Sequence, residues 1–212
     1  MTSPNPPNAD APLLVFGAGG HGRVLVDAAL RSQHWHQILV SDRKLPDHLN
    51  EMFPGICLIT PTAALLLNPS VHIAIGNNHF RQKESAAWGY ERLVSVVHPA
   101  ATISAFSHID VGCFVAAGAV VAPSARLAMG VIVNHGAVVD HDVAVGEFSH
   151  VAPHASLGGH VKLGQRVLIG SGAVVLPSVT IGDDVTIGAG AVVIADVLEP
   201  GVYAGIPARK IS

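Results

Sequence analysis

The sequence of 212 residues has little charge, few cysteines and no long apolar run, and each of these absences restricts its function. Only 13% of the residues are charged and the formal net charge is −3, so neither nucleic acid nor an anionic membrane is expected as the main partner. Cys57 and Cys113 are the only cysteines and form no CxxC pair, which argues against a disulfide framework or a thiolate metal site. No apolar run is long enough to cross a bilayer. Residues 1–12 lack the basic start and apolar core of a signal peptide, so we expect a flexible tail and a cytoplasmic protein.

What the sequence does have is a period of six. An aliphatic residue stands at every sixth position from Ile103 to Val193, and a small or β-branched residue, such as Ala101 or Ala173, stands two places before it. This period fits neither an α-helix nor an alternating strand. It is typical of a parallel β-helix, in which each six-residue unit forms one side of a triangular coil of about 18 residues. We therefore expect a β-helix domain over 100–198, with 199–212 as a cap that closes the stack.

Residues 13–99 have a different pattern, in which short apolar runs alternate with helical spacing. Strands are expected at Leu13–Gly17, Ile38–Ser41, Ile56–Thr60, Val71–Gly76 and Leu93–Val97, and helices at Val24–Leu30 and Phe80–Glu91. This alternation predicts an α/β domain with a small parallel sheet and right-handed crossovers. His98-Pro99 interrupts the pattern, which places the domain boundary near residue 99.

A glycine-rich motif, GAGGHG at Gly17–Gly22, joins the first predicted strand to the first predicted helix. Such glycines let the backbone approach a diphosphate at the helix N-terminus, and Asp42, at the end of the next strand, can accept a ribose hydroxyl. A tight turn that needs glycine only for its conformation is the alternative interpretation. NAD is a further candidate, but a domain of about 85 residues is shorter than the two halves of a full dinucleotide-binding fold. We therefore expect a nucleotide-linked sugar, with Gly76 at the same carboxyl edge of the sheet.

Five of the thirteen histidines fall within a short stretch of the repeats: His135, His141, His150, His154 and His160. His141 stands two places after an inward aliphatic residue, which predicts a position at a corner of the coil, and Asp142 stands one coil from His160. A carboxylate beside a corner histidine favours the imidazolium and suits proton transfer. The alternative is a set of ordinary surface histidines, with a simple contact between His160 and Asp142. Zinc held by three histidines, as in γ-class carbonic anhydrases, is a remote alternative because the spacings differ.

From Leu13 to Ile211 the chain resembles the bacterial sugar acetyltransferases that join a nucleotide-sugar domain to a left-handed β-helix. This family includes bacillosamine and perosamine N-acetyltransferases and sialic acid O-acetyltransferases. The motifs that carry the resemblance are Gly17–Gly22, Ile75–Asn78, Val139–Asp142, Gly146–Val151 and Val202–Arg209. The likeness is closest to the enzymes that N-acetylate GDP-perosamine.

This resemblance implies an activity and its partners. We expect acetyl-CoA as co-substrate, no metal, and a homotrimer with its active sites between subunits. The expected reaction is acetylation of the 4-amino group of a nucleotide-linked 4-amino-4,6-dideoxy sugar. UDP-bacillosamine-type N-acetylation and sialic acid O-acetylation remain open as alternatives.

The same resemblance implies a set of site residues. His141 would be the catalytic base, and Asp142, which is Glu in some relatives, would raise its basicity. The residues expected to hold acetyl-CoA are His150 at the thioester, Asn134, Gly159, Ser171 and Thr180, with Arg209 and Lys210 at the phosphates. Those expected to bind the nucleotide sugar are Gly17, Gly19, Gly20, His21, Gly22, Ser41, Asp42 and Gly76. Ser41 stands where some relatives have an acid.

Overall fold

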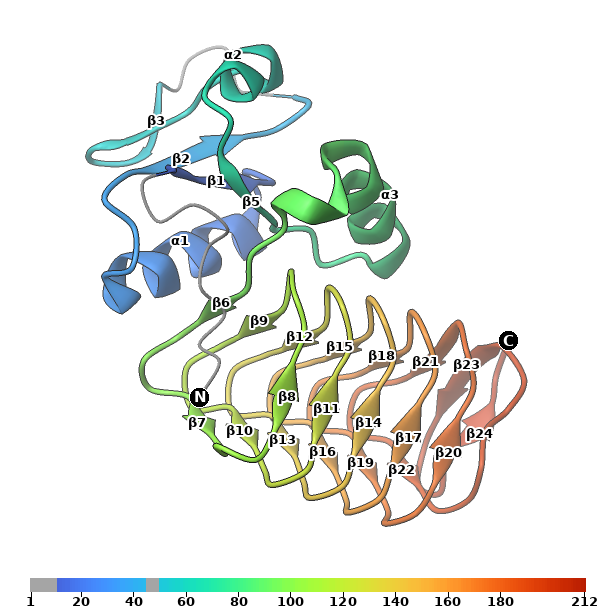
Figure 1. Ribbon diagram of the computed structural model, residues 1–212. Helices are drawn as coiled ribbons and strands as arrows, with labels where there is room; N and C mark the ends of the chain where they lie inside the picture. The colour runs from blue at the N-terminus through green and yellow to red at the C-terminus, as the bar shows by residue number, and fades with distance from the viewer. Residues whose placement is uncertain (1–10, 45–49) are drawn as a thin grey trace.

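The computed structural model describes residues 11–44 and 50–212. An α/β domain packs on one side of a three-sided, left-handed parallel β-helix, so both parts of the predicted fold class are confirmed (Figure 1). Within these residues no helix is long and apolar enough to cross a membrane.

A three-stranded parallel sheet forms the centre of the α/β domain. Its strands are β1 (Leu13–Phe16), β2 (Ile38–Ser41) and β5 (Ser70–Ile73), in the order β2-β1-β5, and all their residues are buried. The helices α1 (Gly20–Ser32) and α3 (Asn78–Trp88) follow β1 and β5. Because β1 is central, the glycine-rich motif that follows it lies in the middle of the carboxyl edge of the sheet.

The predicted strand Ile56–Thr60 takes a different form. Its first residues make β4 (Ile56–Cys57), which pairs antiparallel with β3 (Glu51–Phe53) outside the main sheet. The short helix α2 (Pro61–Leu66) follows and was not expected from the sequence. Its start has a recognisable signal, because the Thr60 side chain accepts a hydrogen bond from Ala63 N and proline occupies the first turn.

Capping residues also set the ends of the second predicted helix. The prediction of Phe80–Glu91 is shifted, because the Asn77 side chain caps the helix and starts α3 at Asn78. The helix stops before Gly89, whose φ of 93° is outside the helical region, and a 3₁₀ turn, η1 (Tyr90–Arg92), follows.

The β-helix is a stack of two-residue strands on three sides. The six-stranded side comprises β7 (Thr102–Ile103), β10 (Val120–Val121), β13 (Val138–Val139), β16 (Ser156–Leu157), β19 (Val174–Val175) and β22 (Val192–Val193). The five-stranded side comprises β8 (His108–Ile109), β11 (Arg126–Leu127), β14 (Ala144–Val145), β17 (Lys162–Leu163) and β20 (Thr180–Ile181). The eight-stranded side comprises β6 (Val96–Val97), β9 (Phe114–Val115), β12 (Ile132–Val133), β15 (His150–Val151), β18 (Leu168–Ile169), β21 (Val185–Ile187), β23 (Gly201–Ala204) and β24 (Arg209–Lys210).

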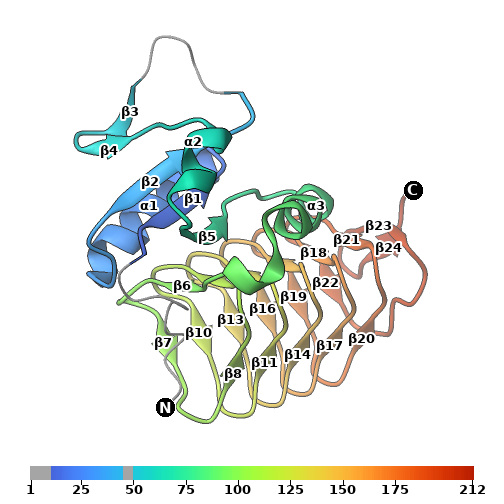
Figure 2. The same ribbon diagram turned by 45° about the horizontal axis from the view of Figure 1, so that its top comes forward.

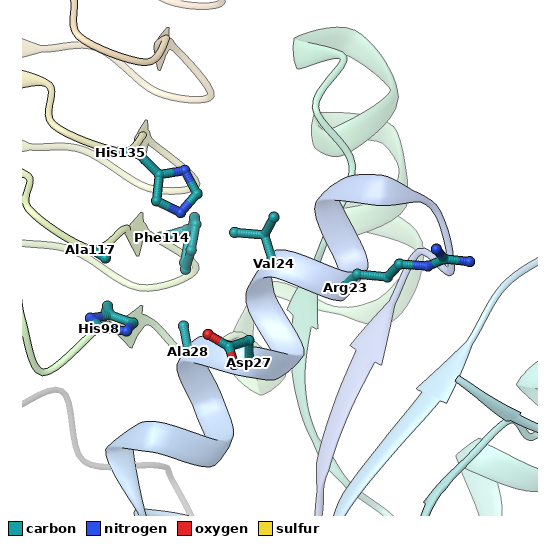
Figure 3. Close-up of a pocket in the computed structure, with 8 residues that line it drawn as sticks. All are labelled: Arg23, Val24, Asp27, Ala28, His98, Phe114, Ala117 and His135. Carbon is teal, nitrogen blue, oxygen red and sulfur yellow. The ribbon is translucent and has the colours of Figure 1, made fainter. Parts of the chain in front are cut away.

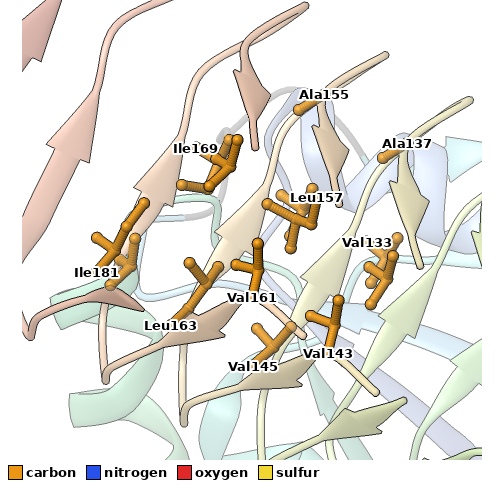
Figure 4. Packing of buried hydrophobic residues seen from close by; sticks show 14 of the residues in the cluster. Val133, Ala137, Val143, Val145, Ala155, Leu157, Val161, Leu163, Ile169 and Ile181 are labelled. Carbon is orange, nitrogen blue, oxygen red and sulfur yellow. The ribbon is translucent and has the colours of Figure 1, made fainter. Parts of the chain in front are cut away.

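The inward positions of the repeat fill the interior of this prism. Aliphatic side chains such as Leu157 and Ile169 are fully buried, and small residues such as Ala137 and Ala155 fit at the corners (Figure 4). Each buried aliphatic side chain contributes roughly 1.5–3 kcal/mol by removal from water. Parallel pairing joins residues one coil apart, as Val121 with Val139, so successive coils present their outward residues in fixed columns.

The α/β domain covers the eight-stranded side, which we call the docked side. Outward residues of that side, Phe114 and Ile132, belong to the same buried cluster as Leu25 and Val26 of α1. Figure 1 shows the domain beside β9, β12 and β15, and Figure 2 shows α3 of the domain beside β18 of the same side. The corner between the six-stranded and five-stranded sides, which we call the opposite edge, therefore faces away from the domain.

Candidate active site

His141 and Asp142 lie at the opposite edge, in the turn between β13 and β14. Nδ1 of His141 is 2.9 Å from Oδ2 of Asp142, and the two side chains are 52% and 44% exposed. Asp142 occupies the left-handed region with φ of 58°, which aspartate tolerates better than most residues. The hydrogen bond to Asp142 raises the pKa of His141, because the carboxylate stabilises the imidazolium. With its Nδ1 proton held by Asp142, the neutral ring keeps Nε2 as a proton acceptor.

The next coil completes this arrangement. A Cβ atom on Gly159 would lie 2.6 Å from Cε1 and Nε2 of His141, so only glycine leaves room for the ring. The backbone N of His160 donates to the carbonyl of His141, and the two rings meet edge to face with centroids 5.2 Å apart. Nε2 of His160 is 3.8 Å from Asp142 Oδ2, so two imidazoles share one carboxylate. Gly159 stands one coil after His141 in the same column, but sequence reasoning assigned it only to acetyl-CoA and missed that it makes room for the His141 ring.

The same three side chains could hold a metal ion. His141, Asp142 and His160 each offer one ligand atom, and these atoms lie within 4.8 Å of one another. Two imidazoles and a carboxylate form a ligand set that zinc accepts. The edge therefore supports two interpretations, a proton-transfer pair and a metal site.

The glycine-rich motif forms a tight loop between β1 and α1. Gly17 has φ of 124°, and a Cβ on Gly22 would lie 2.0 Å from the Gly17 carbonyl oxygen, so both positions require glycine. Asp42 holds the loop from the neighbouring strand, because its Oδ2 accepts a 2.8 Å hydrogen bond from Ala18 N. One oxygen of the predicted ribose-binding carboxylate is thus already engaged by the loop itself.

The space in front of this loop is open. An added Cβ on Gly19, Gly20 or Gly76 would meet no atom within 4 Å. The N-terminus of α1 has no side-chain cap and no acidic residue in its first turn. Uncapped N–H groups at a helix N-terminus attract anions, so the loop, α1 and the end of β5 form a cradle suited to a diphosphate.

Of two further residues predicted for this cradle, one is buried and the other is partly buried. Ser41 is fully enclosed and its Oγ has no hydrogen-bond partner, so its side chain does not reach the open space. His21 packs its ring edge-on against Phe114, with centroids 5.4 Å apart, and its Nε2 is also buried without a partner. Burial, followed by the charge of Arg81, lowers the pKa of His21 to about 4, so it is neutral at pH 7.

His150 and Asn134 lie near His21 and not near His141. The Asn134 amide is 3.1 Å from Nε2 of His150 on β15, and the rings of His150 and His21 are 6.4 Å apart. Burial, followed by the charge of Arg81, lowers the pKa of His150 to about 3, although a hydrogen bond to the Gly76 backbone opposes this shift. Within one chain, this group belongs to the docked side and His141 to the opposite edge.

A groove of about 280 Å³ runs between α1 and the β-helix. Its lining residues are Arg23, Val24, Asp27, Ala28, His98, Phe114, Ala117 and His135. Figure 3 shows Val24 pointing across the groove toward Phe114 and His135. None of these residues was predicted as a site residue, because the groove is created by the docking of two domains. The nearest sequence signal is the column that Ala117 and His135 share in the repeat.

The remaining residues predicted to bind acetyl-CoA are distributed around the prism. Ser171 lies at the corner between β18 and β19, and Thr180 lies on β20 of the five-stranded side. Arg209 and Lys210 lie on β24 at the far end, where they line a second groove of about 200 Å³. Lys210 Nζ is 3.3 Å from a Glu199 carboxylate oxygen, and both residues are exposed. One chain does not gather these residues around His141.

Comparisons with known proteins identify both parts of the chain. Residues 12–86 match the PglD N-terminal domain, and residues 160–195 match the bacterial transferase hexapeptide (six repeats). The acetyltransferase domain of PglB from Neisseria gonorrhoeae FA1090 is 34% identical over 95% of this chain and 100% of that chain, with a TM-score of 0.87. The same domain has been solved in complex with acetyl coenzyme A, at 35% identity, equal coverage and a TM-score of 0.86.

PerB from Caulobacter crescentus, solved in complex with CoA and GDP-perosamine, is 33% identical over 95% of this chain and 97% of that chain, with a TM-score of 0.86. No curated protein sequence matches the chain.

Proposed function

We propose, from the premise that this chain belongs to the bacterial sugar N-acetyltransferases with a PglD N-terminal domain, that it acetylates the 4-amino group of a nucleotide-linked 4-amino-4,6-dideoxy sugar. Its family makes it an acetyl-CoA-dependent acyltransferase. GDP-perosamine is the best candidate for the acceptor, because it is the ligand of one relative of similar length and fold. The single observation that carries the assignment to this chain is the His141–Asp142 pair at the edge of a hexapeptide prism.

The reaction is a direct transfer. The sugar amine attacks the thioester carbonyl carbon, and a C–N bond forms as the C–S bond breaks. CoA leaves as the thiolate with the electron pair of that bond, the amine proton passes to His141, and protonation of the thiolate gives free CoA. Asp142 supports this step because it stabilises the imidazolium that results. A covalent acyl-enzyme on Cys113 is disfavoured, since burial raises the pKa of that thiol to about 12.

The nucleotide sugar occupies the cradle formed by the glycine-rich loop, α1 and Gly76. Support comes from the open space before Gly19 and Gly20 and from the uncapped helix N-terminus. On this basis we propose that residues 13–99 bind the nucleotide sugar, 100–198 carry out acetyl transfer and 199–212 cap the prism, in a cytoplasmic protein.

The active site is shared between subunits of a homotrimer. His141 lies at the opposite edge and the cradle lies toward the docked side, so one prism separates them. The six-stranded side next to His141 presents an apolar row, whereas the five-stranded side presents polar residues such as Arg126 and Lys162. The outward residues of the six-stranded side are Thr102, Val120, Val138, Ser156, Val174 and Val192, of which the four valines form the apolar row. An exposed apolar face of this kind fits a subunit interface with rotational symmetry.

The reaction is tested by incubating the protein with acetyl-CoA and a panel of GDP-, UDP- and CMP-linked amino and hydroxy sugars, with free thiol as the readout. We expect the fastest release with GDP-perosamine and a product acetylated at nitrogen. Fastest turnover with a UDP-linked amino sugar or O-acetylation of a sialic acid would favour those alternatives. Metal analysis tests the zinc interpretation, which requires stoichiometric zinc for activity. Absence of thiol release with every acceptor contradicts the proposal.

The shared site is tested by mixing two inactive variants. His141→Ala removes the base, and Gly19→Leu fills the cradle without strain, since Gly19 has an ordinary φ of −80° and a Cβ there meets nothing. In randomly mixed trimers about a quarter of the sites combine an intact base with an intact cradle, so about a quarter of the wild-type activity should return. A mixture as inactive as its parents would show that each subunit completes its own site.

A further inference from the structure

Arg81, in the first turn of α3, is a buried cation without an acidic partner. Its side chain is only 1% exposed, and no ion pair among the described residues includes it. Its guanidinium donates to six acceptors: the carbonyls of Ile75, Gly76, Gly130, Phe148 and Ser149, and Oδ1 of Asn78. Three of these acceptors lie in the α/β domain and three in the β-helix.

This placement is costly. Burial lowers the pKa of Arg81 to about 9, so the group remains charged at pH 7 but has lost its hydration. The positive end of the α3 helix dipole adds to the cost, because a cation in the first turn is repelled by it. The hydrogen bonds to neutral acceptors offset the lost hydration and the repulsion by the helix dipole. The charge therefore depends on these six contacts, and an apolar side chain in its place would leave their acceptors unpaired.

We propose that Arg81 is a positioning residue for the nucleotide-sugar site, which fixes the end of β5 against the prism. The inference rests on the proposed function, since Gly76 is part of the cradle. The Arg81 Nη1 atom holds the carbonyls of Ile75 and Gly76 at 2.9 and 3.2 Å, while Nε holds that of Gly130 in the β-helix at 2.8 Å. The planar guanidinium of Arg81 thus sets the distance between the cradle and the β-helix at Gly130.

Neighbouring contacts make the cradle dependent on this distance. Asn78 ties the same segment to the prism through the carbonyls of Arg166 and Val167, at 2.9 and 3.1 Å. Apolar contacts elsewhere in the interface tolerate sliding, whereas these directional bonds do not. A misplacement of about 1 Å at a reacting centre costs on the order of 10²-fold in rate.

The uncompensated charge supplies a second contribution. Arg81 lowers the pKa of both His21 and His150, so its field reaches the glycine-rich loop and the facing strand. The same positive potential favours a bound diphosphate. Arg81 therefore acts on the substrate through the loop it holds and through its field, without direct contact.

The test compares Arg81→Met, which keeps the apolar volume but no donor, with Arg81→Lys, which keeps the charge and fewer donors. Arg43→Met is the matched control, because Arg43 binds Glu84 on the same helix but is largely exposed. For Arg81→Met we expect about a tenfold or larger rise in KM for the nucleotide sugar and in the Kd for GDP, with a lower kcat. The KM for acetyl-CoA should change less than about twofold, Arg81→Lys should be intermediate, and Arg43→Met should match the wild type in both constants.

The outcomes separate this inference from the proposed function. If calorimetry detects no binding of GDP or UDP to the wild type, and no acceptor turns over, the proposed function and this inference both fail. If the wild type binds a nucleotide and Arg81→Met or Arg81→Lys binds it equally well with unchanged kinetics, Arg81 has only a structural role. An equal rise in KM for both substrates also contradicts positioning. Should Arg81→Met fail to fold, Arg81→Lys alone decides by the same comparison.

Discussion

The histidines of the opposite edge and those of the docked side occupy contrasting environments in one chain. At the edge, His141 is half exposed and the hydrogen bond to Asp142 raises its pKa. At the docked side, His21 and His150 are partly buried, and the loss of hydration lowers their pKa to about 4 and about 3. The same side chain is therefore an available base in one region and a neutral packing group in the other.

The two regions therefore contribute different properties to the protein. The side chains of the opposite edge bury little surface on folding, so they can contact substrate without a loss of stability. The docked side holds two domains together, so its side chains serve stability and position. Substitutions at the edge should change rates and leave the free energy of unfolding unchanged. Substitutions at the docked side should change the free energy of unfolding and, at Arg81, the binding of the nucleotide sugar as well.

The largest effect on rate is expected for His141→Ala. A positioned general base contributes about 10²–10⁴-fold, so kcat should fall by that range and recover in part at higher pH, where more of the amine is neutral. The free energy of unfolding should change by less than about 0.5 kcal/mol, because the side chain is exposed. Steady-state kinetics and urea unfolding measure the two quantities. A wild-type rate in this variant would remove the edge from the mechanism.

The strongest effect on stability is expected for Phe114→Ala at the docked side. Phe114 is fully buried and lies edge-on to His21 and His72, with centroids 5.4 and 6.3 Å away. Truncation should cost about 3–5 kcal/mol in urea unfolding. Phe106→Ala is the matched control, because Phe106 belongs to the same prism but is 81% exposed. Equal unfolding midpoints for the two variants would contradict the assigned role of the docked side.

A smaller effect on rate is expected for Gly159→Ala. The new methyl group would meet the His141 ring at 2.6 Å and displace it, so kcat should fall by about 10- to 100-fold with little change in unfolding. In a His141→Ala background the same change should have no further effect, since no ring remains to be moved. An additional loss in the double variant would assign Gly159 a role of its own, such as contact with pantetheine.

The sequence predicts the prism well, because every coil repeats one local pattern. The period of six identifies the inward positions, and counting one coil of spacing brings Asp142 near His160, as observed at 3.8 Å. The corner position of His141 follows from the same arithmetic. These features depend on residues that are neighbours in the repeat, so a single chain is enough to predict them.

Docking between the domains could not be predicted in this way. The outward residues of β9 and β12 are apolar, but so are those of β10 and β13, and only the first pair is covered by the α/β domain. The groove at α1, the burial of His21 and the contacts of Arg81 all arise from that choice of side. Nothing in the periodicity distinguishes the two faces, because both satisfy the same local rule.

The remaining prediction uses pH to distinguish the two regions. His21, His72 and His150 are held neutral, with pKa values lowered by burial to about 4, 3 and 3. Between pH 6.5 and about 4 these histidines are protonated in the unfolded chain and neutral in the folded chain. The free energy of unfolding therefore has its full value above pH 6.5 and decreases as the pH falls. Each such group contributes a slope of roughly 1.4 kcal/mol per pH unit in that window. The raised pKa of His141 has the opposite effect on the free energy of unfolding, but His141 is exposed, so its contribution is small.

Urea unfolding at pH 7.5, 6.5 and 5.5 measures this slope. His72→Leu should be less stable than the wild type at pH 7.5, because the Val94 carbonyl loses its 2.9 Å contact with the ring. The slope of its unfolding free energy against pH should nevertheless be shallower, because one titrating histidine has been removed. Identical slopes in the wild type and His72→Leu would mean that His72 takes up a proton equally well in the folded and unfolded chain, which would contradict its assignment as a neutral buried group.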